Sequence, residues 1–412
     1  MFSSKGLACV ASALFFFYSI ASLSFFNVIS QNLIGEFSLT PEKLGLLSSG
    51  YLYANALWLI PAGFLFDKFS TRQLMLGAML TDVIGIFIMC LSHTTPEIFI
   101  GRILCGSASA FVLLGTVRTG VKLYPGKHAG KAIGFMISFG VLGGSFGNSF
   151  FSLLENYVNW HTSALLFGVL GILIFMFLFQ MNTAMIQRTQ PVLKNIVSIF
   201  KNPANWLAGL YIGLMNLPVF ILASLWGEIY LTKVQALSAG EAAQISGLIF
   251  FGVMIGSSFF GYASDRMGRR KPLLWIGAVL SMAFMLLLIF AAPPLNPWYA
   301  GALFLLIGFS IASQVIIYPL IAEMNPTEVS SMAQGLASTI NNLIGAVMQA
   351  VFGYIIMSDT HVQTYQRGMF NHGLTALLLA FLCAFVIVFV LRETFCRMLN
   401  PVGLHSLAKD AQ

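Results

Sequence analysis

Residues 63–72 read GFLFDKFSTR, and residues 261–270 read GYASDRMGRR. The two stretches align without a gap at an offset of 198 residues, with matching residues at four places: Gly63, Asp67, Lys68 and Arg72 in the first, and Gly261, Asp265, Arg266 and Arg270 in the second. A further set matches at an offset of 201, in which Pro125, Ala132 and Gly134 correspond to Pro326, Ala333 and Gly335. A sequence that repeats itself over half its length predicts two similar structural units.

The composition places these units in a membrane. Of the 412 residues, 58% are hydrophobic and only 8% are charged, whereas a soluble domain carries about 25% charged residues. The 38 phenylalanines are the opposite of a disordered composition. We therefore expect a surface that faces mostly lipid.

Apolar runs of the length that crosses a bilayer, about 20 residues, occur twelve times, six in each half. The predicted all-α membrane protein therefore has two pseudo-symmetric six-helix halves, 1–181 and 203–392, with a cytoplasmic linker at 182–202 and a tail at 393–412. The predicted spans are 6–28, 42–66, 72–92, 96–121, 128–154, 160–181, 203–231, 241–264, 271–292, 298–321, 330–357 and 369–392.

The cations indicate the orientation of these spans. If the N-terminus is inside, 16 of the 21 Lys and Arg residues lie at inner ends or loops, and only Lys43, Lys233 and Arg367 lie outside. Cytoplasmic loops carry such an excess, so both termini are expected in the cytoplasm, below the cell (inner) membrane. The same bias explains the net charge of +7 without a nucleic-acid partner.

The linker has a pattern of its own. Leu193, Ile196, Val197 and Phe200 recur at helical spacing, and lysines flank them. This pattern predicts a short amphipathic helix on the inner membrane surface. An unstructured cationic linker is the alternative.

The duplicated loop resembles the signature loop of the major facilitator superfamily, and Arg102-x-x-x-Gly106 in the fourth span resembles that family's second motif. The resemblance implies a secondary transporter that alternates between two states. It also implies that the loop residues lock one of these states. These candidates are Gly63, Asp67, Lys68, Arg72, Asp265, Arg266 and Arg270. Ser70 departs from the family's usual glycine, which Gly268 supplies in the second copy.

Ionisable residues at membrane depth are costly and usually functional or paired. Asp82 and Arg102, on spans joined by a short outer turn, are expected to pair. Arg102 or Arg118 could instead bind a carboxylate or phosphate of a solute, with Asp82 or Glu228 carrying a coupling proton. Each also has a structural interpretation: a static ion pair for Asp82 and Arg102, a snorkelling cation for Arg118, and a solvated acid for Glu228.

By the same resemblance, helices one, four, seven and ten line a central cavity. Amides at lipid depth need partners and so face inward, where they bind solute or hold helices together. The candidate solute-binding residues are Asn27, Gln31, Asn55, Arg102, Arg118, Asn148, Tyr211, Asn216, Trp226, Gln314, Tyr318, Asn341 and Asn342, and Gln349 is a further polar candidate. This set suits a small polar, anionic or zwitterionic molecule.

The chain has no pattern typical of an enzyme, a metal site, a disulfide framework or an ATP-binding loop, so we expect no cofactor. The hypothesis is a monomeric transporter that imports a small organic solute, such as an amino acid, organic acid or nucleoside-like molecule, with protons. Asn148 stands where drug exporters often have proline, and the residues around Tyr51 and Pro61 resemble bacterial nutrient importers. Drug or siderophore export, lipid movement and solute sensing are the alternatives, although the short linker and tail leave little room for a signalling domain.

Overall fold

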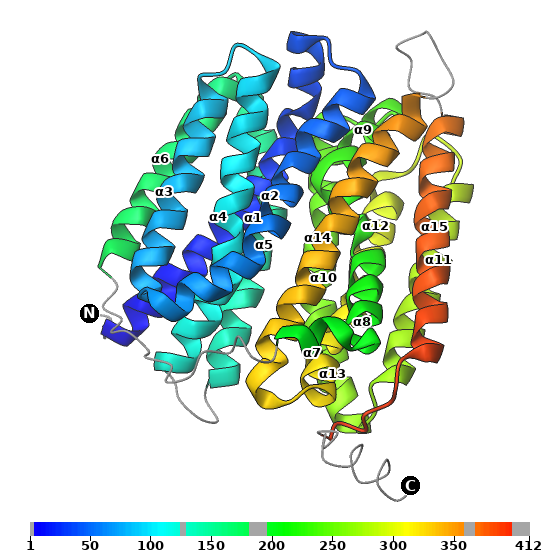
Figure 1. The fold of residues 1–412 in the computed structure, drawn as a ribbon. Coiled ribbons are helices and arrows are strands. Elements are labelled where there is room, and N and C mark those ends of the chain that lie inside the picture. The colour runs from blue at the N-terminus through cyan, green and yellow to red at the C-terminus, as the bar shows by residue number, and fades with distance from the viewer. Residues whose placement is uncertain (1–3, 124–128, 181–195, 358–366, 398–412) are drawn as a thin grey trace, which may run out of the picture.

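The computed structural model describes residues 4–123, 129–180, 196–357 and 367–397, which are helical with no strand in those ranges. Figure 1 shows a bundle of long helices in two groups that stand side by side. The start of α1 and the end of α15 lie at the same end of the bundle, called the lower end here, as it is drawn in Figure 1. The turns between α2 and α3 and between α10 and α11 also lie there.

The first half contains six long helices: α1 (Ser4–Phe37), α2 (Pro41–Lys68), α3 (Thr71–Cys90), α4 (Thr95–Leu123), α5 (Ala129–Glu155) and α6 (Trp160–Phe179). Polar N-caps start several of them. Ser70 and Gln73 form a complete capping box at α3, and Asn159 caps α6. These side chains satisfy backbone N–H groups that the first turn of a helix leaves free.

The second half begins with a short helix and contains two interrupted spans. Its elements are α7 (Ile196–Lys201), α8 (Pro203–Met215), η3 (Val219–Trp226), α9 (Gly227–Lys233), α10 (Ala239–Met267), α11 (Lys271–Phe290), α12 (Pro297–Ile311), η4 (Ala312–Ile316), α13 (Ile317–Met324), α14 (Thr327–Met357) and α15 (Arg367–Val390). α8, η3 and α9 follow one another as the span Pro203–Lys233, and α12, η4 and α13 form the span Pro297–Met324.

Twelve transmembrane helices were expected, and the fold agrees. Among the described residues, eleven segments are long and apolar enough to cross a membrane. α2 is the remaining long helix, with 28 residues packed between α4 and α14. The bounds differ from the predicted ones by at most three residues, except that α1 ends at Phe37 and not at residue 28, because its polar last turns at Asn27, Gln31 and Asn32 bind other helices.

The interruptions in the seventh and tenth spans were not predicted. η3 is a π-helix that follows Pro218, and η4 is a 3₁₀ segment that precedes Pro319. Proline has no N–H, and its ring displaces the carbonyl of the preceding turn. For Pro319 this turn lies in η4, whereas for Pro218 it is the end of α8, so the α-helical hydrogen-bond ladder stops just before η3 begins.

Only part of the predicted amphipathic linker helix lies in the described residues. α7 covers 196–201, whereas Leu193 falls in a range that the structure does not describe. Ile199 is buried and Phe200 is exposed. The side chains of Asn205 and Trp206 donate to the carbonyls of Ile199 and Phe200, so this turn is attached to α8.

The repeat seen in the sequence recurs in the packing. In the first half α1 packs on α5, α2 on α4 and α3 on α6, and in the second half α8 packs on α14, α10 on α12 and α11 on α15. The two halves meet through α2 with α14 and α5 with α10. Each half is therefore one packed body, and the interface has the same approximate symmetry.

One close contact occurs in both halves. A Cβ atom on Gly106 of α4 would lie 2.0 Å from the carbonyl oxygen of Tyr51 on α2. A Cβ atom on Gly308 of α12 would lie 2.2 Å from the carbonyl oxygen of Ile249 on α10. Glycine lets the two backbones touch, so the glycine of the second family motif has a packing role that its counterpart shares.

We expect Gly106→Ala to lower the thermal stability of the purified protein, because its methyl group must push α2 and α4 apart. Overpacking of this kind costs about 1–3 kcal/mol. Thermal unfolding in detergent measures the effect. Gly77→Ala is the matched control, since nothing lies within 4 Å of a Cβ atom there and alanine favours the helix by up to about 1 kcal/mol. Equal melting temperatures for the two variants would contradict the packing role.

Candidate functional site

A chain of three amides lies at mid-depth in the second half. Gln314 of η4 donates from Nε2 to Oδ1 of Asn216 at 2.8 Å, and Asn216 donates from Nδ2 to Oδ1 of Asn341 at 3.2 Å. Asn216 ends α8 and Asn341 lies on α14. Oε1 of Gln314 is buried without a hydrogen-bond partner in the described residues, so the chain retains an unused acceptor.

A second amide contact joins the two halves at the same depth. Asn342 of α14 donates from Nδ2 to Oδ1 of Asn55 on α2 at 2.9 Å, and Asn55 donates to Ser109 of α4 at 3.0 Å. Asn342 is the sequence neighbour of Asn341. The two amide sets therefore lie on consecutive residues of α14, next to the interface between the halves.

Nearer the upper end, α1 and α5 reach the irregular span of the second half. Asn27 donates to Asn148 at 2.7 Å, and Asn148 donates to the carbonyl of Ala223 in η3 at 3.2 Å. Gln349 of α14 donates to the carbonyl of Phe220 at 2.8 Å. Amide side chains from both halves thus bind carbonyls of the π-helix.

Glu228 lies close to this contact and is buried. Gln31 of α1 donates to Oε1 of Glu228 at 3.1 Å, and the other carboxylate oxygen has no hydrogen-bond partner among described groups. The side chain is 3% exposed. The interpretation of Glu228 as a solvated acid is therefore wrong, because the end of α1 covers it.

The expected ion pair between Asp82 and Arg102 is not formed. Arg102 lies between the rings of Phe26 and Tyr51, 4.4 and 4.7 Å from their centroids, and donates to the carbonyl of Ser48 at 3.2 Å. Neither carboxylate oxygen of Asp82 has a hydrogen-bond partner in the part of the chain described. The guanidinium is directed towards α1 and α2, where aromatic faces attract it.

Four other candidates lie within one half, apart from the amide chain. Arg118 lies over the ring of Phe66 and donates to its carbonyl at 2.5 Å. The other three candidates are buried or half-buried aromatic residues. Tyr211 donates to the carbonyl of Leu274, Trp226 packs against Phe352, and the hydroxyl of Tyr318 lies 3.4 Å from the hydroxyl of Ser338.

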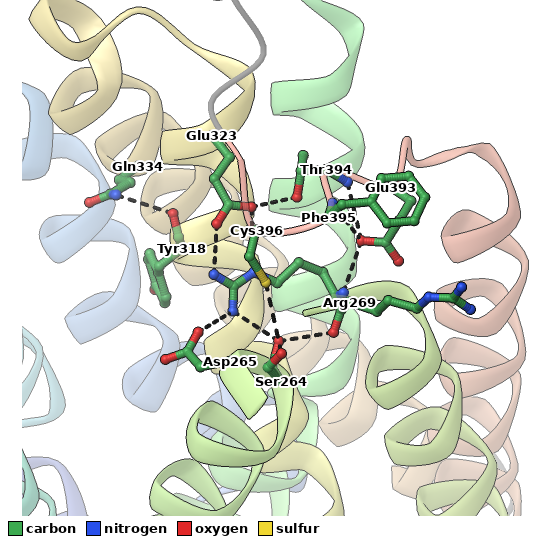
Figure 2. Close-up of polar contacts among 11 residues, drawn as sticks. Ser264, Asp265, Arg269, Tyr318, Glu323, Gln334, Glu393, Thr394, Phe395 and Cys396 are labelled. Atoms are coloured by element: carbon green, nitrogen blue, oxygen red, sulfur yellow. Dashed lines mark hydrogen bonds and ion pairs between the residues drawn. The ribbon is translucent and has the colours of Figure 1, made fainter. Parts of the chain in front are cut away.

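The second signature loop forms a charged network at the lower end of the second half (Figure 2). Arg270 donates to Asp265 at 2.7 Å and to Glu323 at 2.6 Å, with its own side chain 6% exposed. Burial alone would lower the pKa of the Arg270 guanidinium, but its hydrogen bonds to Glu323 and Asp265 raise that pKa above the usual arginine value. Arg270 is therefore permanently charged and paired.

The segment after α15 completes the network. The two carboxylate oxygens of Glu393 accept the backbone N–H groups of Arg270 and Lys271, each at 2.9 Å. Thr394 donates to Glu323. A carboxylate at a helix N-terminus is favoured by the free N–H groups and the helix dipole. We did not predict the role of Glu393, because 123 residues separate it from Arg270.

The described side chains of the first signature loop make different contacts. Arg72 donates to the carbonyl of Phe179 and lies over its ring at 4.9 Å. At the offset of 201, Glu323 corresponds to Lys122, so the acid that holds Arg270 is replaced by a cation. The side chain of Asp67 falls outside those described.

The remaining lock candidates do not join the network. Lys68 and Arg266 are exposed, and Arg266 contacts only the hydroxyl of Tyr262, at 3.4 Å, among described side chains. Gly63 has open space around its Cβ position. The structure therefore brings together Asp265 and Arg270 of the predicted set.

Comparisons with known proteins give a consistent result. A family model described as the Major Facilitator Superfamily matches residues 10–350. The probable 4-methylmuconolactone transporter of Cupriavidus pinatubonensis is 24% identical over 395 residues, covering 92% of this chain and 89% of that protein. The probable galactarate/D-glucarate transporter GudP of Escherichia coli is 22% identical over 372 residues, covering 80% and 82%.

Among solved structures, a bacterial homologue of the human lysosomal transporter Spinster, inward-facing and unoccupied, resembles this fold with a TM-score of 0.75. The sequence identity is 16%, and the match covers 97% of this chain and 100% of that one. This likeness concerns the fold alone.

We expect Arg270→Ala to destabilise the second half, since it leaves the half-buried Glu323 carboxylate without its cation. Removing one partner of a buried pair costs about 3–5 kcal/mol, and the exposure of Asp265 places this case at the low end. Thermal unfolding in detergent is the measurement. Arg266→Ala removes an exposed arginine of the same loop and should leave the melting temperature unchanged. A similar fall of the melting temperature in both variants would show that removing any cation of this loop destabilises the protein, and would contradict a specific role of the Arg270 network.

Proposed function

The chain belongs to the Major Facilitator Superfamily, and from this premise we propose that it imports a small polar organic solute together with protons. It is a multi-pass membrane transporter and not an enzyme. The solute in this proposal is anionic or zwitterionic, such as an organic acid, an amino acid or a nucleoside-like molecule. The membrane is the cytoplasmic (inner) membrane, with the lower end of the bundle in the cytoplasm, and the transporter acts as a monomer.

The amide chain of Asn216, Gln314 and Asn341 carries the proposal. Amide N–H groups bind carboxylates and hydroxyls, and amide carbonyls bind ammonium groups and N–H donors. The unused acceptor on Gln314 suits a solute that offers a donor. The named relatives, which handle a lactone and sugar acids, support an organic acid.

We place the solute at these amides and not at Arg102 or Arg118. Both guanidinium groups already lie over aromatic rings and donate to backbone carbonyls of α2. A solute would have to displace these contacts inside the packed first half. The role of the two arginines in this proposal is to hold α4 against α2.

Alternating access in this proposal is a rocking of the two packed halves about the amide site. Five hydrogen bonds between described side chains and their partners join the halves, and each lies at mid-depth or nearer the upper end. This pattern supports a conformation in which the upper end is closed. Rocking would break these bonds and open that end.

Transport by purified protein in liposomes tests the proposal. A thermal-shift screen against organic acids, amino acids, nucleosides and sugars first selects the solute. We then expect an inwardly directed proton gradient to drive its accumulation, and a protonophore to abolish that accumulation. Unchanged uptake after the gradient collapses would exclude proton coupling. Gradient-driven efflux from right-side-out vesicles would favour the exporter alternative.

We expect Asn216→Ala to weaken solute binding at least about tenfold, the effect of losing one or two hydrogen bonds. Titration of the thermal shift with the selected solute measures the affinity. Asn205→Ala is the contrasting variant, because Asn205 pairs with Asn325 at 2.7 Å at the lower end of α8. It should lower the melting temperature and leave the affinity intact. Unaltered affinity in Asn216→Ala would remove the amide chain from the solute site.

A further inference from the structure

Glu228 and Gln31 form the polar contact between α9 and α1, which belong to different halves. Gln31 donates from Nε2 to Oε1 of Glu228 at 3.1 Å and to the hydroxyl of Thr232 at 3.2 Å. Thr232 in turn donates to the carbonyl of Glu228 at 2.8 Å. Breaking the upper interface therefore exposes Glu228, and closing it buries Glu228.

A second acid lies beside this contact on the first half. Glu155, the last residue of α5, accepts from Asn32 of α1 at 2.8 Å, and its other carboxylate oxygen is buried without a partner among described groups. Asn32 follows Gln31 in sequence, so consecutive amides of α1 bind one carboxylate from each half. Glu155 and Glu228 therefore both lie against the upper end of α1.

We propose that Gln31, Glu155 and Glu228 form a proton-binding site whose occupation closes the upper end of the transporter. The proposal rests on the proton-coupled transport proposed above. It adds the place where the proton acts and the movement that it controls.

The charges around Glu228 support a neutral form in the closed state. Among described side chains, no cation lies within ion-pair distance of Glu228, and its one donor is the neutral Gln31. On its own helix Lys233 is exposed, and on α1 Glu36 is bound to Trp160 at 2.7 Å. The nearby Glu155 would add repulsion if both acids were ionised.

Burial of an ionised carboxylate costs several kcal/mol unless it is paired, whereas a protonated carboxyl loses much less on burial. The closed state therefore binds the proton more tightly than a state that exposes Glu228 to water. A ligand shifts an equilibrium towards the state that binds it better. Protonation from the upper side thus favours closure there, which is the inward-turning step of import with protons.

Asp82 fits the role of the proton-binding acid less well than Glu228. It is fully buried within the first half, and the contacts around it come from the first half, such as Cys105, whose thiol donates to its backbone carbonyl at 3.6 Å. Rocking of rigid halves leaves these surroundings unchanged. Protonation of Asp82 therefore has no direct link to the upper interface.

Hydrogen exchange of the full chain tests the inference without any solute. Exchange is measured between about pH 5 and about pH 9.5, a range in which buried carboxyl groups with raised pKa values lose their protons. The rates are corrected for the intrinsic pH dependence of amide exchange. In the wild type, peptides covering α9 and the upper end of α1 should lose protection at least threefold as the pH rises. Glu228→Gln, which retains the acceptor for Gln31 without a charge, should stay protected across the range.

Three further variants complete the test. Glu36→Gln and Asp82→Asn should follow the wild type. Gln31→Leu removes the donor to Glu228 and should be less protected at every pH, so it provides an answer if Glu228→Gln fails to fold.

A wild type without a pH-dependent change in α9, or a Glu228→Gln variant that follows the wild-type pH dependence, would overturn the inference. Failure of proton-driven uptake with the pH-dependent closure intact would instead overturn the proposed function.

Discussion

The backbone contacts at Gly106 and Gly308 are the constraint on which the rest of the structure depends. Each lets two helices of the same half touch without side chains between them, so each half moves as one body. The halves also pack on each other, chiefly through α2 with α14 and α5 with α10, and five hydrogen bonds of described side chains cross between them. A rocking motion therefore separates the polar contacts between the halves and leaves the contacts of Gly106 and Gly308 inside each half intact.

The sequence predicts the twelve spans because lipid imposes a simple rule: a crossing helix needs about 20 apolar residues. The duplicated loop also predicts the division into two halves. The interruptions at η3 and η4 were open to prediction from Pro218 and Pro319, since proline inside an apolar run disturbs the helix. The apolar run alone could not show them.

Contacts between side chains were harder to predict. Asp82 and Arg102 lie on adjacent helices, but arginine is long, and the aromatic faces of Phe26 and Tyr51 compete for its charge. The binding of Glu155 and Glu228 by consecutive amides of α1 brings together helices from different halves, which spacing along the chain does not describe. The amide candidates were predicted better, because an amide at lipid depth must face other protein, and Asn27, Asn148, Asn216 and Gln314 all do.

The contact of Glu393 with the start of α11 has a practical consequence for handling the protein. A carboxylate that follows α15 by three residues caps the neighbouring helix α11, so residues 391–397 are part of the folded lower end. A reporter or affinity tag that replaces the residues after Val390 would remove Glu393, and the backbone N–H groups of Arg270 and Lys271 would lose their acceptor. A tag attached after residue 397 would keep the cap, and with it the native end of α11.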